Sequence, residues 1–185
     1  MASSVIQSID GIIVKKKPLF EHDCLLTIIS KEQGMIRILA KYALSKKFRF
    51  GGYLDGFYRL DIEYKEGKSF NFLSQLSAIE RYPKLRQSYA ALMLGYYMAQ
   101  VISQVVSTEY PCPEIYELFC ETLAALDAGE PPERLRDSFH RHFLRIEGIE
   151  DSAITKADSF IPSLERYLGK TIYIPDYLRT SATKS

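Results

Sequence analysis

The sequence contains few of the residues that build metal sites. Its three cysteines, Cys24, Cys112 and Cys120, are an odd number without a paired CxxC spacing. None of the three histidines is suitably spaced to complete a four-ligand zinc site. We therefore expect buried free thiols, and neither a metal nor another cofactor.

Recognisable catalytic groupings are also missing. The chain has no GxSxG motif and no phosphate-binding P-loop. His140 and His142 are two residues apart, so they point to different sides of a helix. His22 stands beside Asp23 with Cys24 as its one nearby nucleophile, and we expect Cys24 to pack inward on its strand. These absences argue against an enzyme.

A long uninterrupted hydrophobic run is absent as well. The first residues, MASSVIQSIDG, have neither the basic start nor the apolar stretch of a secretion signal. The most apolar window, residues 90–106, is interrupted by Gln100, Ser103 and Gln104 and falls short of a bilayer span. We expect no membrane association and a cytoplasmic location.

The whole chain has almost no excess of one charge, since its formal net charge is +1, but its two halves differ. Residues 1–86 contain fifteen Lys or Arg and nine Asp or Glu, which gives a net charge of +6. Residues 87–185 contain nine basic and fourteen acidic residues, a net charge of −5. This asymmetry favours a polyanionic partner for the amino-terminal half.

The stretch AKYALSKKFRFGGYLDGF, residues 40–57, carries the most functional information. Positive side chains neutralise phosphates, and flat rings stack on bases exposed in a single strand. The alternative is a solvated loop whose rings pack back into a core. The charge asymmetry favours the nucleic-acid interpretation. The basic and aromatic residues that alternate here are Lys41, Tyr42, Lys46, Lys47, Phe48, Arg49, Phe50 and Tyr53.

The first eighty residues predict five short strands. Such a set, with a longer connection between the third and the fourth strand, is typical of a small closed barrel, with the OB-fold as the first candidate. An SH3-like barrel would give much the same pattern. The expected strands are residues 11–17, 24–30, 35–41, 57–64 and 69–80.

The hydrophobic period changes to that of helices after Pro83. Residues 85–106 are apolar nearly all round, which predicts a helix at the centre of a bundle. A second helix is expected from Glu114, with Gly129 as its carboxyl-terminal cap, and a third begins at Pro131-Pro132.

A weaker helix over 162–168 and an extended segment over 171–178 complete the prediction. The expected fold class is α+β, with an OB-fold domain over residues 1–82 and a helical domain over residues 83–185.

This order of parts resembles the bacterial recombination mediator family RecO. Members carry a stretch close to AKGARRPKSRFAGALQPF, and residues 40–57 resemble it position by position without a gap. Upstream, the strand, Glu-x-Asp, Leu-Leu-Thr strand and turn glycine of the family correspond to residues 11–34. Downstream, residues 113–135 and 164–172 are similar to a bundle helix and to a carboxyl-terminal segment. The residues that match the first pattern are Ala40, Lys41, Ala43, Lys47, Arg49, Phe50, Gly52, Leu54 and Phe57.

Two departures from the family pattern stand out. An adjacent basic pair of the family is replaced by Leu44 and Ser45, which lowers the local charge. Many members also carry a cysteine-bearing zinc module, where this chain has only residues 147–160 without cysteine. The chain is therefore expected to be shortened and to lack the zinc site.

The resemblance implies a protein of DNA repair and recombination that acts without covalent catalysis. It would bind single-stranded DNA, anneal complementary strands and help to load the recombinase RecA, an indirect partner, onto DNA coated by single-strand-binding protein. The implied partners are the ring-forming protein RecR and the acidic tail of single-strand-binding protein, and the implied location is the nucleoid. An RNA-binding OB-fold protein and a protein-interaction adaptor remain as alternatives.

Two groups of residues are the candidate sites. On the barrel we expect phosphate contacts and stacking from Lys15, Lys16, Lys17, Arg37, Lys41, Tyr42, Lys46, Lys47, Phe48 and Arg49, whereas Phe50 and Phe57 are expected to fill the barrel. On the third helix, three arginines spaced seven and four residues apart share one face beside an apolar one. This partner-binding surface consists of Arg134, Phe139, Arg141, Phe143 and Arg145.

Overall fold

The computed structural model describes residues 5–54, 57–106, 110–149 and 160–175. The chain forms two compact units. The first comprises Met1–Tyr82 and Val106–Pro113, and the second comprises Pro83–Val105 and Glu114–Ser185. Val106–Pro113 was predicted in the helical domain, and its contacts group it with the first unit. One contact that holds it there joins Cys112 Sγ to the carbonyl oxygen of Ser30, 3.9 Å away.

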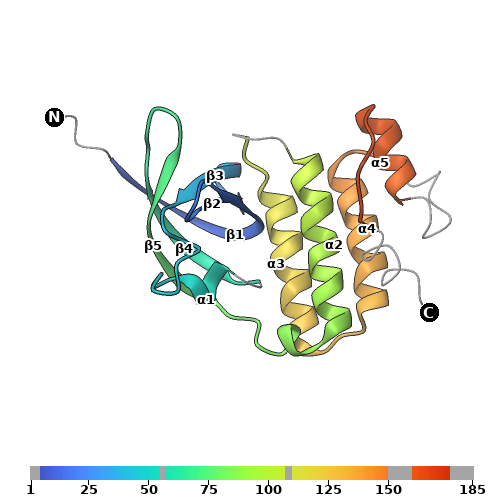
Figure 1. Cartoon of the computed structure of the whole chain (residues 1–185). Coiled ribbons are helices and arrows are strands. Elements are labelled where there is room, and N and C mark those ends of the chain that lie inside the picture. The colour runs from blue at the N-terminus through green and yellow to red at the C-terminus, as the bar shows by residue number, and fades with distance from the viewer. Residues whose placement is uncertain (1–4, 55–56, 107–109, 150–159, 176–185) are drawn as a thin grey trace. The chain divides into compact units, whose positions relative to one another are not determined.

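The first unit contains a closed five-stranded barrel (Figure 1). Its strands are β1 (Ile6–Leu19), β2 (Asp23–Ser30), β3 (Gly34–Ala40), β4 (Arg59–Lys65) and β5 (Asn71–Glu80), and the short helix α1 (Gly51–Leu54) lies between β3 and β4. The strands follow the order β1-β2-β3-β5-β4, and the parallel pairing of β3 with β5 closes the barrel. This arrangement confirms the predicted OB-fold class.

Alternating burial explains why these segments form strands. Along β4, every second side chain is buried, as expected for a strand with one face in a core. Cys24 is buried, as predicted, but Cys112 and Cys120 are only half-buried, so the expectation of three buried thiols was wrong for two of them. The barrel core consists of Ile9, Ile13, Cys24, Leu26, Ile28, Ile36, Ile38, Ala40, Leu54, Leu60, Ile62, Tyr64 and Leu76.

Strand β1 is longer than the sequence predicted. It begins at Ile6 rather than at Gly11, because its first half pairs with β4 and its second half with β2. Polar cross-strand contacts stabilise the first half. The guanidinium of Arg59 donates to both carboxylate oxygens of Asp10 at 2.6–3.0 Å. Because this half of the strand carries polar residues, its hydrophobic pattern did not indicate a strand.

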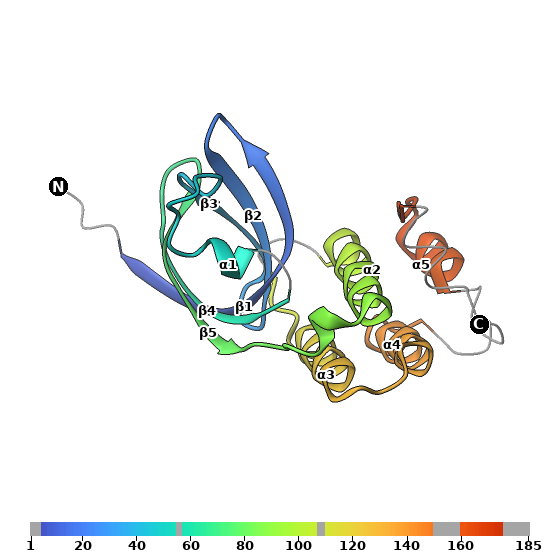
Figure 2. The same cartoon turned by 60° about the horizontal axis from the view of Figure 1, so that its bottom comes forward.

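The second unit is built from helices. They are the 3-10 helix η1 (Leu85–Gln87) and the α-helices α2 (Tyr89–Val105), α3 (Pro113–Ala128), α4 (Pro132–Ile146) and α5 (Phe160–Leu168). Figure 2 shows α2, α3 and α4 packed side by side, with α5 next to them. Among the described residues, no helix is long and apolar enough to cross a membrane.

The predicted end of α3 and the predicted start of α4 are confirmed, whereas the helix expected over residues 85–106 is divided into η1 and α2, and α5 begins at Phe160 rather than at residue 162. Gly129 follows α3 with φ of +93°, and its N–H donates to the carbonyl oxygen of Leu126. The N–H of Glu130 donates to Ala125, which completes the hydrogen-bond pattern of a Schellman cap. Pro132 is the first residue of α4, where its missing N–H costs nothing. Of the predicted extended segment, Thr171–Pro175 is non-helical, and the remainder lies outside the described residues.

Aromatic rings fill the core between α4 and α5. Phe139, Phe143 and Phe160 are 0–1% exposed and meet at tilted or edge-on angles. The imidazole of His140 stacks on Phe160 with 3.8 Å between centroids and 8° between planes. Its Nε2 lies 3.0 Å from the hydroxyl of Tyr97, so the neutral imidazole has a hydrogen-bond partner in the core.

Protonation of His140 is expected to destabilise the fold. Burial, with a smaller contribution from the nearby Arg136, lowers the pKa of His140 to about 3. The unfolded chain, with an ordinary pKa of 6.5, therefore binds more protons than the folded chain between pH 6.5 and pH 3. The free energy of unfolding should fall by about 2–3 kcal/mol from this group between pH 7 and pH 4.5.

Urea unfolding of the wild type and of His140→Gln at both pH values measures this effect. The variant should lose less stability on acidification than the wild type does. Equal losses in the two proteins would contradict the assignment.

Candidate nucleic-acid interface

Five of the predicted nucleic-acid residues lie around one hollow on the barrel. The hollow has a volume of about 450 Å³ and lies between the loop that follows β3 and the beginning of β5. Its lining consists of Lys41, Tyr42, Ser45, Lys47, Phe48, Arg49, Phe50, Leu73 and Ser74. Among the described residues that line it, three are cations and none is a carboxylate. We call this feature the basic hollow.

The loop after β3 is held in place by hydrogen bonds that its backbone N–H groups donate. The N–H of Tyr42 donates to Oδ1 of Asp23 at 2.9 Å, and the N–H of Leu44 donates to the carbonyl oxygen of His22 at 3.0 Å. Further turn hydrogen bonds join Ser45 to Tyr42 and Phe48 to Ser45. The loop is therefore a series of turns tied to the start of β2, which gives the cations defined positions.

Aromatic rings position two of these cations. The guanidinium of Arg49 lies 4.3 Å from the ring centroid of Phe50, and it also reaches the carbonyl oxygen of Ser74 at 3.4 Å. Nζ of Lys41 lies 4.9 Å from the ring centroid of Phe72. Both side chains remain exposed. These cation–π contacts direct the positive charges while leaving them open to a ligand.

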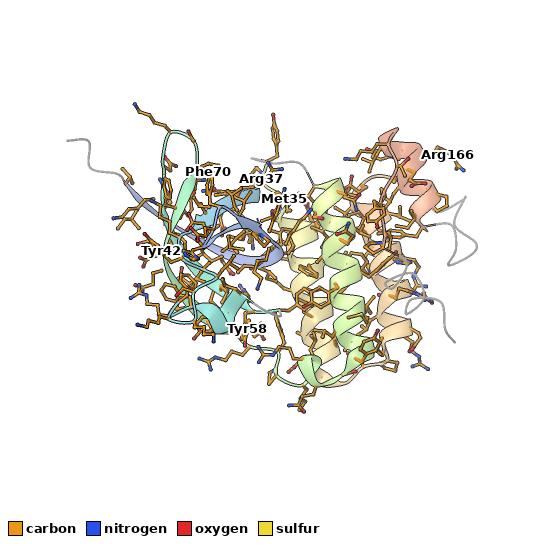
Figure 3. All side chains as sticks on the ribbon, in the orientation of Figure 1. Met35, Arg37, Tyr42, Tyr58, Phe70 and Arg166 are labelled. Carbon is orange, nitrogen blue, oxygen red and sulfur yellow. The ribbon has the colours of Figure 1, made fainter. Side chains whose placement is uncertain are left out.

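The two candidate stacking rings differ in exposure. Tyr42, labelled in Figure 3, is 65% exposed and belongs to the lining of the basic hollow. Phe48 is half-buried, packs against the barrel core and meets Phe50 edge-on at 5.7 Å. Phe57 is buried, as predicted, and Phe50 is half-buried against the core. Tyr42 is thus free to stack on a base, whereas Phe48 offers only part of its ring.

Three further candidate cations lie on the outer face of β1–β3. Lys15 lies opposite Thr27, which in turn lies opposite Arg37, so this row crosses three strands on one face. Lys17 lies opposite Leu25 in the next row of the same face. Lys15, Lys17 and Arg37 are exposed. The barrel therefore presents these cations together.

The remaining two candidates do not join these groups. Lys16 lies opposite Leu26, a core residue, so strand alternation places it on the other side of β1 from its neighbours. Lys46 is exposed on the loop but does not line the basic hollow. Their sequence neighbours suggested a continuous basic patch, but strand and turn geometry separate them from it.

A second hollow of about 780 Å³ lies beside Arg37. Lys68 and Phe70, from the β4–β5 connection, contribute to its lining together with Asn71, the first residue of β5, and Met35. These residues were not among the predicted contacts, although the β4–β5 loop is a ligand-binding element in OB-folds and its residues could have been included on that ground. Met35, Arg37 and Phe70 are labelled in Figure 3. Because Glu32 and Glu66 also line this hollow, it is less positive than the basic hollow.

The partner-binding surface on α4 differs from the expectation. Arg134, Arg141 and Arg145 are exposed, but Phe139 and Phe143 are each 0% exposed. The prediction of an open apolar groove beside the arginines was therefore wrong, because α5 supplies Phe160 to cover both rings. No group of three or more metal-binding side chains that could hold a metal ion is found in the part of the chain that the structure describes.

Comparisons with known proteins agree with this architecture. Residues 3–82 match the family model "Recombination protein O N terminal", and residues 86–150 match "Recombination protein O C terminal". The two models thus cover the barrel and most of the helical unit.

Curated relatives named DNA repair protein RecO are also similar to this chain. The protein of Acaryochloris marina is 34% identical over 116 residues, which are 63% of this chain and 40% of the relative. The protein of Bifidobacterium longum is 31% identical over 142 residues, 75% of this chain and 59% of the relative. The protein of Anaeromyxobacter sp. is 28% identical over 141 residues, which are 75% of this chain and 56% of the relative. The chain thus spans about half the length of the curated relatives it matches.

Proposed function

The chain belongs to the RecO family, and on that premise we propose that it binds single-stranded DNA through its barrel in recombinational DNA repair. The basic hollow carries the proposal. Lys41, Lys47 and Arg49 line it without a described carboxylate, and Tyr42, which is 65% exposed, also belongs to its lining. Positive charge for phosphates beside a ring for bases is the combination that binds single strands with little sequence preference.

Strand annealing follows from the same surface. Two complementary strands repel each other until part of their phosphate charge is neutralised. The outer face of β1–β3 adds Lys15, Lys17 and Arg37 to the cations of the basic hollow, so a bound strand loses much of its charge. Stacking leaves the pairing edges of the bases accessible. The protein therefore acts by binding and charge neutralisation rather than by covalent catalysis.

Partner proteins complete the proposed role. As family members do, the protein would help to load the recombinase RecA onto strands coated by single-strand-binding protein. It would act together with the ring protein RecR, and its location would be the cytoplasm, at the nucleoid. On this chain, the exposed Arg134, Arg141 and Arg145 are the proposed docking site for an acidic tail. With Phe139 and Phe143 buried, that contact is electrostatic and should weaken as salt rises.

The salt dependence of DNA binding tests the proposal. Six exposed cations share the outer face or the basic hollow: Lys15, Lys17, Arg37, Lys41, Lys47 and Arg49. If each contacts a phosphate, the plot of log K against log salt has a slope of about −4. Fluorescence anisotropy of a labelled oligo(dT) between 50 and 400 mM salt measures the slope. Absent binding, or a slope near zero, would refute the proposal.

Competition separates the proposal from the RNA-binding alternative. Unlabelled oligo(dT) should displace the labelled strand, and a structured RNA hairpin of equal length should do so poorly. Preferential displacement by the hairpin would favour an RNA-binding protein instead. An adaptor that used its basic half for an acidic protein would bind neither nucleic acid.

A further inference from the structure

Two exposed aromatic residues adopt a backbone conformation that bulky side chains rarely take. Among the described residues, Phe20 and Tyr42 are the non-glycine positions with positive φ, at 56° and 57°. The left-handed region is sterically unfavourable for residues with a Cβ, and glycine or asparagine is the usual occupant. Both rings are nevertheless solvent-exposed, Phe20 by 71% and Tyr42 by 65%.

Core packing does not explain this choice of residues. A ring that is more than half exposed gains little from burial, so its contacts within the fold offset little of the backbone strain. An unfavourable conformation kept at an exposed side chain points to a role for that side chain outside the fold. The coincidence of strain, exposure and aromatic character at two positions is the observation that needs an explanation.

The two positions belong to segments that are joined to each other. Phe20 is the first residue of the three-residue turn between β1 and β2, and the paired residues Leu19 and Asp23 flank this turn. Asp23 accepts the hydrogen bond from the N–H of Tyr42, and His22 accepts the one from Leu44. The β1–β2 turn and the loop after β3 are therefore fastened together, with one strained aromatic residue on each.

The charges around these rings favour a polyanion over an apolar protein surface. Lys17 lies near the end of β1, and Lys41 immediately precedes Tyr42. Of the two acidic neighbours, Asp23 accepts the Tyr42 N–H, whereas the side chain of Glu21 is 90% exposed, with a carboxylate oxygen 3.9 Å from Nε2 of His22. Leu44, two residues after Tyr42, is 45% exposed and adds apolar surface to the same loop.

We propose that Phe20 and Tyr42 form a stacking platform for unpaired nucleobases, with Lys17 and Lys41 contacting the adjoining phosphates. This inference rests on the proposed function and assigns Phe20, which the sequence did not single out, to the binding surface. The strained backbone holds both rings outward before the ligand arrives, so less ordering is needed on binding.

Glycine substitutions test the platform without damaging the fold. Phe20→Gly and Tyr42→Gly remove the ring and suit the positive φ, so each variant should unfold in urea at no lower concentration than the wild type. Each should weaken oligo(dT) binding by about 5- to 150-fold. Tyr89→Ala, a control at an equally exposed aromatic residue of α2, should leave binding unchanged.

A tryptophan reporter tests stacking directly. The chain contains no tryptophan, so Phe20→Trp introduces a single fluorophore that can be excited selectively. Oligo(dT) should quench its fluorescence, whereas an abasic oligonucleotide of the same length, which offers phosphates without bases, should not. A platform also predicts that the wild type binds the abasic strand more weakly than oligo(dT) at equal salt.

The outcomes separate the inference from the function on which it rests. Failure of the wild type to bind either strand refutes the proposed function itself. Tight, salt-dependent binding of both strands with equal affinity, unaffected by Phe20→Gly, keeps the function and overturns the platform. Quenching by oligo(dT) alone, together with weaker binding by both glycine variants, supports it.

Discussion

Replacing Lys41, Lys47 and Arg49 together with glutamate is expected to weaken binding of single-stranded DNA by about 100-fold or more at 0.1 M salt. These residues supply the positive charge of the basic hollow. Each phosphate contact on a single strand contributes about 0.7 to the slope of log K against log salt, so the slope should become shallower by about 2. Anisotropy titrations of oligo(dT) at several salt concentrations measure both quantities, and strand annealing should fall in parallel.

A matched variant controls for the change in net charge. Arg134→Glu/Arg141→Glu/Arg145→Glu alters the charge of the chain equally, on exposed positions of α4. It should retain most of the DNA affinity, and it is the variant expected to lose binding to an acidic tail peptide. Lys46→Glu, beside the basic hollow but outside its lining, should cost less than Lys47→Glu. Equal losses in the two triple variants would mean that net charge, rather than the hollow, determines binding.

Phe160→Ala is expected to lower the free energy of unfolding by about 3–5 kcal/mol. The ring of Phe160 is 1% exposed, stacks on His140 and meets both Phe139 and Phe143. Its removal leaves a cavity between α4 and α5 and uncovers three aromatic neighbours at once. Urea or thermal unfolding followed by circular dichroism measures the loss.

An exposed residue of the same helix provides the control for Phe160→Ala. Tyr167 is 57% exposed, so Tyr167→Ala should change stability by less than about 0.5 kcal/mol. If Phe160→Ala cost no more than Tyr167→Ala, the packing of α5 on α4 would not be the stabilising contact described above. The experiment also reports on the α4 surface, because Phe139 and Phe143 become candidates for partner contact only if α5 leaves them.

Local patterns in the sequence were sufficient to predict the barrel and most helix ends. Alternation along β4, the glycine after α3 and the proline at the start of α4 each reflect a constraint confined to a few neighbouring residues. The beginning of β1 was missed because a salt bridge between Asp10 and Arg59 stabilises it. These two residues are far apart in the sequence, so no local pattern indicates that they meet. Long-range pairing was the missing information.

The candidate site was harder to predict for the same reason. The sequence identified the cations of the loop after β3, and alternation in the predicted strand 11–17 already separates Lys16 from Lys15 and Lys17. It could not show the register shift between Ile13 and Lys15, which determines which of these lysines lie on the outer face. It also placed Phe139 and Phe143 at a surface, because an amphipathic pattern does not reveal which helix will cover it. Phe20 escaped notice since its importance depends on a backbone angle, not on residue type.

The barrel is closed by its shortest seam. Strands β3 and β5 share two residue pairs, Ile38–Asn71 and Leu39–Phe72, whereas β2 and β3 share seven. The basic hollow spans this seam, with Lys41 and Tyr42 on one side and Leu73 and Ser74 on the other. A DNA strand bound there would contact both sides of the β3–β5 pairing and so stabilise the part of the barrel that has the fewest residue pairs. Bound DNA would then stabilise the closed barrel, and the closed barrel would in turn favour DNA binding.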